Sequence, residues 1–519
     1  MEHILSLDAG TGSIRAVLFN KEGKQLGVAQ QEWTHHADPR YPGSMDFAWE
    51  ANWEKVVNCI REVLRTTGIP PSTIKALSAT SMREGLVLYD EDGREVWACA
   101  NVDARAGYEV KELKERDEHM ELDIYNMSGQ TYALGAIPRL LWLKKHEPQI
   151  YEKVACMTMI NDWILYRLSG VLQVDPSNGC TTGLFDLESR GWKVEIAERC
   201  GLKATIFPPV HEAGKVIGTV SEEAASRCGL SPSTLVVAGG GDAQMATVGA
   251  GAIANEQTVV SGGSFWQQEV NIKEPLVDKS GRIRVNCHAV EGLWQLEAIG
   301  FFPGLVMRWF RDAFCQEEKQ KASFTGRDAY EILEEKARTV PVGSNGILPI
   351  FSDTMNYIAW RHAAPSFLNL SLDAERTGKM EMFKSLQENA ALVTLGNLLL
   401  IRESTGFFPK EVIFVGGASK GKLWSQTLAD VLGVPVRVPV VKEAAALGTA
   451  MFAGLGAGMF ASIEEAAATV VEWECTYMPD LENHKTYLEI YEKWRKVYIE
   501  QLKLADIGLT SHMWKAPGL

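Results

Sequence analysis

The sequence predicts an α/β protein of two lobes, each built around a β-sheet. Strand-like and helix-like stretches alternate from the start of the chain, as in α/β folds. A strand, a glycine-rich turn and a second strand occur near the N-terminus and again in mid-chain. At 519 residues the chain is also too long for one ordinary domain. We interpret the repetition as an internal duplication of the fold, with one lobe in residues 1–250 and the other in residues 251–519.

The composition indicates a globular protein and excludes some classes of partner. Hydrophobic residues make up 46% of the chain and charged residues 23%. A net charge of -14 argues against nucleic acid, although a few local donors can still bind a small phosphorylated ligand. The nine cysteines are scattered and form no C-x-x-C pair. This pattern favours free thiols in a reducing compartment such as the cytoplasm.

Residues 3–20 read as a β-hairpin with a glycine-rich turn. An apolar run ends at Asp8, the turn Gly10-Thr11-Gly12-Ser13 follows, and a second apolar run covers residues 16–19. The backbone N–H groups of such a turn, with the hydroxyls of Thr11 and Ser13, form a concavity suited to phosphate. Arg15 adds positive charge, and Asp8 is placed to hold a hydrated cation beside the phosphate. An ordinary hairpin turn remains the simpler interpretation of this stretch alone.

Further strands and a helix follow in the first half of the chain. Residues 25–33 indicate a third strand, residues 49–67 show helical spacing, and strands are expected at 75–80 and 86–89. Between these last two strands lie Arg83 and Glu84, at a loop of the kind where α/β proteins bind ligands. The pair can bind the hydroxyls of a polyol, or it can be an ordinary solvated pair.

A second polar cluster, Asn101 to Arg105, offers a similar choice. Its Asp103 is either a ligand contact or the N-cap of a helix.

The second glycine-rich region begins with a strand at 234–238, which leads into Gly239-Gly240-Gly241-Asp242. Asp242 is the best candidate for a general base, because a carboxylate within reach of a hydroxyl can accept its proton during attack on phosphorus. Its alternative role is that of a helix N-cap. Strands at 257–261 and 265–270 then enclose the turn Gly262-Gly263-Ser264.

A third glycine-rich turn, residues 416–421, lies between a strand at 411–415 and an amphipathic run at 423–432. It nearly fits a Walker A loop, but Leu423 stands where a Ser or Thr belongs. It also matches G-x-S-x-G, which would make Ser419 a hydrolase nucleophile with Asp480 and either His484 or His512 downstream. The preferred interpretation is a glycine turn at a helix N-terminus that touches a nucleotide.

One uncharged stretch, residues 444–463, has the length of a membrane span. Because it consists mostly of Ala and Gly, which gain little from transfer to lipid, we expect a buried helix packed against another backbone. The residues after 482 are expected to form a surface helix.

Three motifs resemble those of the FGGY carbohydrate kinases, in the same order along the chain. Asp8 to Arg15 resembles their phosphate motif, Gly239 to Asp242 their catalytic loop, and Gly416 to Ser419 their adenosine motif. The resemblance implies an actin-like fold of two RNase H-like lobes with a ligand cleft between them. It also implies an ATP-dependent kinase for a small molecule, with Mg²⁺, and neither a nucleic-acid nor a membrane partner. Phosphotransferase-system proteins control some members, so a phosphocarrier partner is expected by analogy only.

The resemblance also implies roles for individual residues. Asp242 is the expected base, and Asp8 the expected Mg²⁺ residue, through water, beside a phosphate turn of Gly10, Thr11, Gly12, Ser13 and Arg15. The acceptor substrate is expected to contact Arg83, Glu84, Asp103, Tyr132, Gln244 and Trp266. ATP is expected to contact Gly262, Gly263, Ser264, Gly416, Gly417 and Ala418.

Three strings differ from those of ordinary sugar kinases, namely residues 81–85, 101–105 and 264–267. Glycerol or a common pentulose is therefore not the expected acceptor. A kinase for another pentulose or polyol, and a non-catalytic actin-like scaffold that binds nucleotide, stay open as alternatives.

Overall fold

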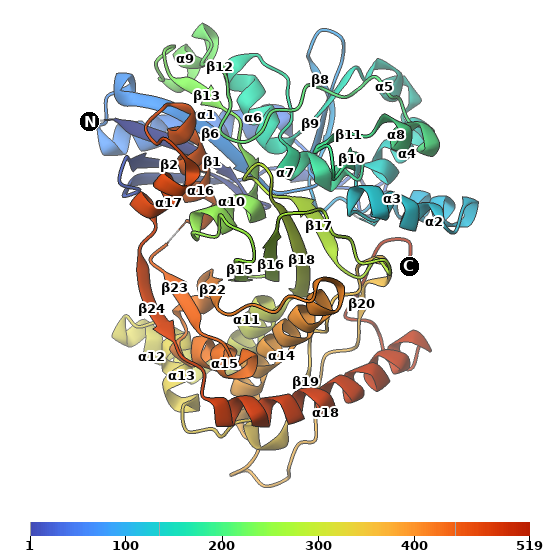
Figure 1. Cartoon of the computed structure of the whole chain (residues 1–519), viewed down its shortest axis with the longest axis vertical. Helices are drawn as coiled ribbons and strands as arrows, with labels where there is room; N and C mark the ends of the chain where they lie inside the picture. The colour runs from blue at the N-terminus through green and yellow to red at the C-terminus, as the bar shows by residue number, and fades with distance from the viewer. Residues whose placement is uncertain (1, 134, 442) are drawn as a thin grey trace.

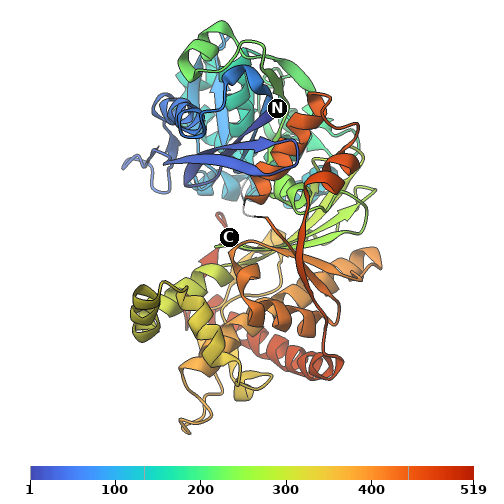
Figure 2. The same cartoon turned by 90° about the vertical axis from the view of Figure 1, so that its left-hand side faces the viewer.

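The computed structural model describes residues 2–133, 135–441 and 443–519, and it arranges them as two lobes, each with a central sheet. Figures 1 and 2 show one lobe above the other, with the N-terminus in the upper lobe and α18 (Leu481–Asp506) in the lower one. The expected α/β class and the two lobes are confirmed.

The sheet of the upper lobe has the strand order β12-β13-β6-β1-β2-β3. The first three strands of the chain form an antiparallel meander, and β6 and β13 then add in parallel beside β1. A short strand, β14, continues the β13 side of β6. The strands are β1 (His3–Ala9), β2 (Ser13–Asn20), β3 (Gln25–Glu32), β6 (Ile74–Ser81), β12 (Val216–Thr219), β13 (Leu235–Val237) and β14 (Gly240–Gly241).

The sheet of the lower lobe repeats this plan, with the order β17-β18-β16-β15-β22-β23-β24. Here β15, β16 and β18 form the antiparallel meander, and β22 and β23 add in parallel beside β15. The shared order supports the internal duplication. The strands are β15 (Thr258–Gly262), β16 (Trp266–Ile272), β17 (Arg284–Cys287), β18 (Trp294–Phe301), β22 (Val412–Val415), β23 (Val436–Pro439) and β24 (Trp473–Tyr477).

Helices cover both faces of the upper sheet. Leu5 and Leu7 of β1 pack into a core with α1 (Trp49–Thr67), α6 (Ile160–Ser169) and α9 (Glu222–Cys228). Ile4 points to the opposite face, into a core with α10 (Asp242–Gly249), α16 (Ala444–Gly456) and α17 (Ile463–Val470). This alternation is the two-residue period of a strand with both faces buried.

Helix α16 is the buried helix expected within residues 444–463, and it crosses α10 at very short range. A Cβ on Gly448 would lie 2.0 Å from the Met245 carbonyl oxygen, and one on Gly249 would lie 2.0 Å from the Ala444 carbonyl oxygen. Glycine at both positions therefore lets the two backbones touch. Across the three described segments, every helix is too short or too polar to cross a membrane.

An additional sheet and several helices extend the upper lobe on one side (Figure 1). The sheet has the order β4-β5-β8-β7-β9. Its strands are β4 (His35–His36), β5 (Asp46–Phe47), β7 (Leu86–Tyr89), β8 (Glu95–Cys99) and β9 (Cys156–Met159). The helices are α2 (Gly107–Arg116), α3 (Met120–Ser128), α4 (Ala136–His146), α5 (Pro148–Lys153), α7 (Pro176–Gly179) and α8 (Val194–Cys200), with the hairpin β10 (Phe185–Asp186) and β11 (Gly191–Trp192).

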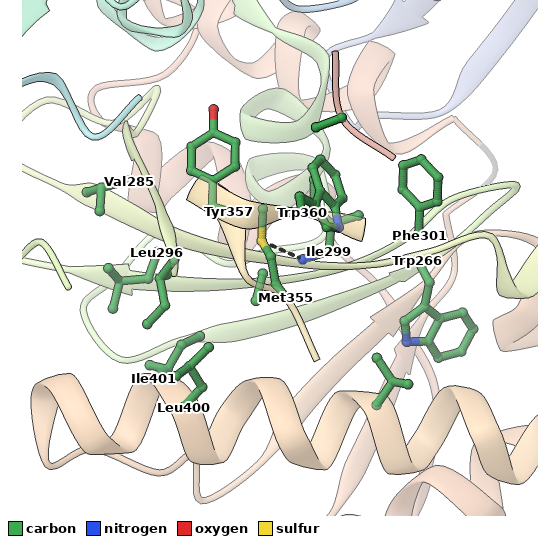
Figure 3. Packing of buried hydrophobic residues seen from close by; sticks show 14 of the residues in the cluster. Trp266, Val285, Leu296, Ile299, Phe301, Met355, Tyr357, Trp360, Leu400 and Ile401 are labelled. Carbon is green, nitrogen blue, oxygen red and sulfur yellow. Dashed lines mark hydrogen bonds between the residues drawn. The ribbon is translucent and has the colours of Figure 1, made fainter. Parts of the chain in front are cut away.

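The core of the lower lobe lies between its sheet and the long helix α14 (Lys379–Thr405). Figure 3 shows Leu400 and Ile401 on this helix facing Leu296 of the sheet, and Trp266 directed toward the helix. The outer layer consists of α11 (Pro303–Phe314), α12 (Gln316–Thr325), α13 (Ala329–Ala337), α15 (Lys422–Leu432) and α18, with the strand pairs β19 (Leu348–Ile350) with β21 (Ser366–Leu368) and β20 (Arg361–His362) with β25 (Trp514–Lys515). All nine cysteines are free thiols.

Candidate active site

The first glycine-rich turn joins β1 to β2, with Asp8 and Arg15 directly opposite each other. Arg15 Nη1 lies 3.5 Å from Asp8 Oδ2 and donates to Glu443 Oε2 at 3.0 Å. Burial raises the pKa of Asp8 to about 6, with Arg15 opposing the rise and Glu443 adding to it. Asp8 is thus a buried carboxyl group whose charge is only partly offset, and such an oxygen donor suits a divalent cation.

The carbonyl groups of the turn are held by the residues that follow β3. Trp33 donates its indole N–H to the Gly10 oxygen at 2.7 Å and its backbone N–H to the Gly12 oxygen at 3.0 Å. A Cβ on Gly12 would meet no atom within 4 Å, and the φ of Gly12 lies outside the left-handed region. The protein therefore needs glycine here neither for packing nor for backbone conformation. The open space leaves the N–H groups of the turn accessible to an anion.

Thr80 on β6 lies between the strand that leads into the first glycine-rich turn and the loop before Asp242. Asp8 is opposite Thr80 in the β1–β6 pair, and Gly240 is opposite Thr80 in the β6–β14 pair. Thr80 Oγ1 also donates to the Gly240 oxygen at 2.8 Å. Two strand spacings separate the backbones of Asp8 and Gly240 by about 10 Å. The fold therefore brings Asp8 and Asp242 toward one space from distant parts of the chain.

The glycines before Asp242 serve packing within the protein. A Cβ on Gly239 would lie 1.7 Å from the Ala79 oxygen, and one on Gly240 would lie 2.4 Å from Ser177 Oγ. Residues of β6 and α7 therefore fill the space beside Gly239 and Gly240, which leaves no room there for a ligand to approach the backbone. The loop is held in turn by Ser177, whose Oγ accepts the Gly241 N–H at 3.0 Å.

Asp242 is the first residue of α10, and the preceding glycine is the N-cap. The alternative that Asp242 caps this helix is therefore wrong. Its side chain is 36% exposed, and Oδ1 accepts the Ala243 N–H at 2.8 Å. Burial of the carboxyl group between the lobes raises the pKa of Asp242 to about 7; Arg83 opposes the rise, and Asp8 adds to it. A reachable carboxylate with a pKa near neutrality has the properties of a general base.

Arg83 and Glu84 are already paired with charged residues of the lower sheet. Arg83 donates to both oxygens of Glu297, at 2.5 and 2.7 Å, and Arg284 Nη2 donates to Glu84 Oε1 at 2.5 Å. Although burial acts to raise it, Arg83 holds the pKa of Glu297 at about 2. The remaining Arg83 nitrogen, Nε, lies 3.9 Å from Asp242 Oδ1. The pair thus lies beside the candidate base, but with most of its hydrogen bonds made within the protein.

Arg139, Arg284 and Glu297 were not predicted as site residues. Arg139 on α4 is buried and donates to the carbonyl oxygens of Glu84, Asn101 and Asp103, the last two at 2.7 and 2.9 Å. It therefore supports Glu84, whose φ of 63° is unusual for a residue with a side chain. A charged residue within the apolar run of α4 was the available signal.

Gln244 lies next to Arg83, and both polar atoms of its buried amide lack a hydrogen-bond partner among the described residues. A Cβ on Gly241 would lie 2.7 Å from Gln244 Oε1 and 3.1 Å from Arg83 Cγ. Buried amides normally find partners, so this one is available to a ligand.

Asp103 is buried in a different set of bonds. Its Oδ2 accepts the Met45 N–H at 2.6 Å and the Arg105 Nε–H at 2.8 Å. It is neither free for a substrate nor a helix cap, because α2 begins at Gly107. Both interpretations of Asp103 are therefore corrected: it fixes the loop that Arg139 also holds.

Trp266 lies in the core, which corrects its expected contact with substrate, whereas Tyr132 is buried with a hydroxyl that has no hydrogen-bond partner among the described residues. Burial of the Tyr132 hydroxyl raises its pKa well above the ordinary range of a tyrosine. Trp266 donates its indole N–H to Thr394 Oγ1 of α14 at 2.8 Å and stacks on Trp424. The next residue, Gln267, points to the opposite face, where its Nε2 lies 3.4 Å from Glu297 Oε1.

The two glycine turns expected to bind ATP lie side by side. Strands β15 and β22 are parallel neighbours that end together, with Ser261 opposite Val415. Gly416 has a φ of 88°, and a Cβ there would lie 2.6 Å from the Gly262 oxygen. By contrast, a Cβ on Gly417 would meet nothing within 4 Å. The turn of Gly262, Gly263 and Ser264 thus joins that of Gly416, Gly417 and Ala418, with open space at Gly417.

The N-terminus of α15 is occupied by a protein carboxylate. Glu334 accepts the backbone N–H groups of Leu423 and Trp424 at 3.1 and 3.3 Å, and a Cβ on Gly421 would lie 2.3 Å from it. Glu334 therefore takes the place of an anion at this helix end, so the expected nucleotide contact is left to the glycine turn before it.

The hydrolase alternative also finds no support in the geometry. Ser419 Oγ donates to the Gly416 oxygen within its own turn at 2.8 Å. His484 Nδ1 lies 3.1 Å from the Asp430 oxygen, and His512 Nε2 lies 2.9 Å from Asp506 Oδ1. Neither histidine is placed to activate Ser419, as a triad requires.

The comparisons with known proteins agree with this geometry. The model of the FGGY family of carbohydrate kinases, N-terminal domain, matches residues 3–249, and that of the C-terminal domain matches residues 270–457. Proteins named autoinducer-2 kinase are 53% identical over 518 residues in Escherichia coli K12 and 51% identical over 519 residues in Yersinia enterocolitica. Each alignment covers 100% of this chain and 98% of the relative.

A solved structure of ligand-bound xylulose kinase from Lactobacillus acidophilus has the same fold, with a TM-score of 0.84 at 20% identity over 97% of this chain and 99% of that one. Because the family models cover most of the residues and the curated relatives align over all of them, the chain belongs to the FGGY family of carbohydrate kinases.

Proposed function

We propose that this kinase transfers the γ-phosphoryl group of ATP to the terminal hydroxyl of the open-chain autoinducer-2 precursor, 4,5-dihydroxy-2,3-pentanedione, as a step in quorum-sensing signal processing. The observation that carries this proposal is the identity of 51–53% over the whole chain to proteins named autoinducer-2 kinase.

Asp242 accepts the proton of the attacking hydroxyl in this reaction. Its carboxyl group is partly open and has a pKa of about 7, so near neutral pH a substantial fraction is ready to accept a proton. Phosphoryl transfer needs positioning and charge neutralisation more than covalent chemistry. The terminal hydroxyl is primary and therefore the least hindered nucleophile for in-line attack.

The residues of the upper lobe fit a nucleotide with Mg²⁺. Asp8 supplies one buried carboxyl group with an incompletely offset charge, and Mg²⁺ in kinases is commonly held by one or two carboxylates together with phosphates and water. Asp8 would hold this ion, which would supply positive charge to neutralise the phosphates. The turn from Gly10 to Ser13 offers backbone N–H groups to the γ-phosphate, and Arg15 adds positive charge beside it. The paired turns at Gly262 and Gly416 hold the adenosine side of ATP.

A kinase for a different pentulose or polyol is the second candidate. A xylulose kinase shares the fold, but at 20% identity the likeness speaks for the fold alone. A non-catalytic scaffold is disfavoured because it has no use for Asp242 or for the unpartnered Gln244 beside it. The nine free thiols agree with an enzyme of the cytoplasm.

An ADP-release assay with four acceptors tests the proposal: the pentanedione, xylulose, ribulose and glycerol. A site built to pair particular oxygens rejects analogues that leave its own polar groups unpaired. We expect the pentanedione to be preferred by about 10² or more in kcat/KM. Phosphorus–proton NMR of the product should place the phosphate on the terminal carbon. Equal or better turnover of xylulose or ribulose would contradict the substrate and retain only the kinase.

A further inference from the structure

Glu269 on β16 is a buried carboxyl group with no partner. Its exposure is 1%, and neither oxygen has a hydrogen-bond partner among the described residues. Trp266 and Gln268, at the alternate positions of the strand, bind Thr394 of α14. Glu269 therefore points to the other face of the sheet, where the neighbouring Gln267 lies 3.4 Å from Glu297. That face meets Arg83 and α10.

The charged groups around Glu269 disfavour its ionisation. Glu297 lies directly opposite it on β18, and like charges at such a pair repel. Arg83, the one cation that acts on Glu269 among the described residues, already gives two hydrogen bonds to Glu297. Asp242 of α10 adds further negative charge. Burial, and then Glu297, raise the pKa of Glu269 well above its usual range.

A neutral carboxyl group differs from a carboxylate in one respect that matters here, since it can donate a hydrogen bond. Glu269 has no hydrogen-bond partner among the described residues. A buried donor without an acceptor costs free energy, so a protonated Glu269 needs an acceptor from elsewhere. The side-chain amide of Gln244, next to Arg83, also lacks a hydrogen-bond partner among the described residues. Two unpartnered polar groups beside Arg83 and Asp242 indicate that a small polar molecule supplies the missing partners.

We propose that Glu269 binds the acceptor substrate as a neutral carboxylic acid and donates its hydrogen to a substrate carbonyl oxygen, close to the hydroxyl that Asp242 deprotonates. That the recognised group is a carbonyl rests on the proposed function. A pentanedione has two carbonyl oxygens, and each can only accept a hydrogen bond. The two arginines of the cluster are committed to Glu84 and Glu297, so Glu269 provides the donor that such an oxygen needs.

Two substitutions separate donation from charge. Glu269→Gln keeps the shape and an N–H donor, so the KM for the acceptor should stay within about threefold at neutral pH. Glu269→Leu removes the donor and should raise the acceptor KM about tenfold or more, the scale of one lost hydrogen bond. Both should leave the KM for ATP unchanged. At alkaline pH the wild-type acceptor KM should rise as Glu269 ionises, and Glu269→Gln should remove this rise.

Glu109→Gln is the matched control, because Glu109 is an equally buried carboxyl group on α2, beside His146 and outside this cluster. It should leave both KM values unchanged. Infrared difference spectra of wild type minus Glu269→Gln at pH 7 provide a second readout. They should contain the carbonyl stretch of a neutral carboxylic acid. Absence of this band, or an acceptor KM that rises equally in Glu269→Gln and Glu269→Leu, would overturn the proposal.

The choice of acceptor keeps this test distinct from that of the proposed function. If the enzyme prefers xylulose or ribulose, the pentanedione assignment fails, but each ketose has a carbonyl and the same KM comparison still tests Glu269. If glycerol is preferred and Glu269→Leu does not change its KM, both proposals are overturned. Circular dichroism melting curves establish that the variants are folded.

Discussion

Arg83 of the upper lobe and Glu297 of the lower sheet form a bidentate ion pair, with nitrogen–oxygen distances of 2.5 and 2.7 Å. Both side chains are buried, at 6% and 0% exposure, and the residues are 214 positions apart in the chain. The pair joins the two halves of the molecule next to the candidate base. In the pair, Glu297 accepts the hydrogen bonds that we expected Arg83 to give to substrate, so Arg83 is fixed in place within the proposed acceptor site.

Arg83→Ala should therefore destabilise the protein as well as weaken acceptor binding. It leaves Glu297 buried without its main partner, and breaking a buried pair in this way typically costs about 3–5 kcal/mol. Urea unfolding followed by fluorescence measures the change. Arg65→Ala is the control, because it breaks the exposed pair with Glu62 and should cost less than about 1 kcal/mol. Equal stability of the two variants would mean that Arg83 is free for substrate.

Asp242→Asn should lower kcat by about 10² or more, since it removes the general base and keeps the shape of the side chain. The affinity for ATP should change little. Isothermal titration calorimetry measures ATP binding, and the ADP-release assay measures turnover. At pH 8 the Asp242→Asn variant should melt at the same temperature as the wild type or at a higher one. The pKa of Asp242 is raised to about 7 in the folded state, so its ionisation destabilises the wild-type fold as the pH rises through about 7. Near-normal turnover would exclude Asp242 as the base.

The pH profile of the wild-type enzyme follows from the same carboxyl group. Because the base must be deprotonated to act, kcat/KM should rise with pH on the acid side and level off above an inflection near pH 7. Asp8 contributes to this raised value, so Asp8→Asn should move the pKa of Asp242 down. Carbon-13 NMR titration of labelled aspartate measures that shift without requiring activity. A rate that stays flat from pH 5 to 8 would contradict the assignment.

Glycines that serve packing should behave differently from glycines that face a ligand. Gly448→Ala places a Cβ 2.0 Å from the Met245 oxygen and should destabilise the protein by about 1–3 kcal/mol, the usual cost of overpacking. Gly12→Ala and Gly417→Ala meet no protein atom within 4 Å and should leave stability unchanged. They should instead raise the KM for ATP about tenfold, on the scale of one lost hydrogen bond. An unchanged KM for ATP in both would separate these turns from the nucleotide site.

The sequence pattern predicted part of each sheet, namely β1, β2, β3, β6 and β13 of the upper sheet and β15, β16 and β22 of the lower one, because buried strands and glycine turns leave local signals. Helix α1 and strands β1 and β22 lie within a residue or two of their expected bounds, and β2 starts three residues earlier than expected. The duplication was visible for the same reason, since each copy starts with a strand, a glycine turn and a strand.

The partners of Arg83 and Glu84 could not be predicted in the same way. Arg284, Glu297 and Glu269 alternate with apolar residues in their strands, a pattern typical of a face exposed to solvent. In the folded chain that face lies against the upper lobe. Only the pairing of distant segments reveals this. The two-residue period of β16 likewise places Trp266 in the core and Gln267 on the opposite face, near Glu297.

The two lobes should close toward each other when the acceptor and the nucleotide are both bound. The phosphate turn and Asp242 belong to the upper lobe, whereas the turns at Gly262 and Gly416 belong to the lower one, so a single nucleotide must be held from both sides (Figure 2). Closure of this kind excludes water, which otherwise competes as acceptor. Small-angle scattering should give a smaller radius of gyration with acceptor and a non-hydrolysable ATP analogue than without ligands. Asp242→Asn allows the same measurement with ATP itself, since it binds both ligands and turns over slowly. A radius that does not change in either experiment would mean that the lobes are fixed at their ligand-free separation.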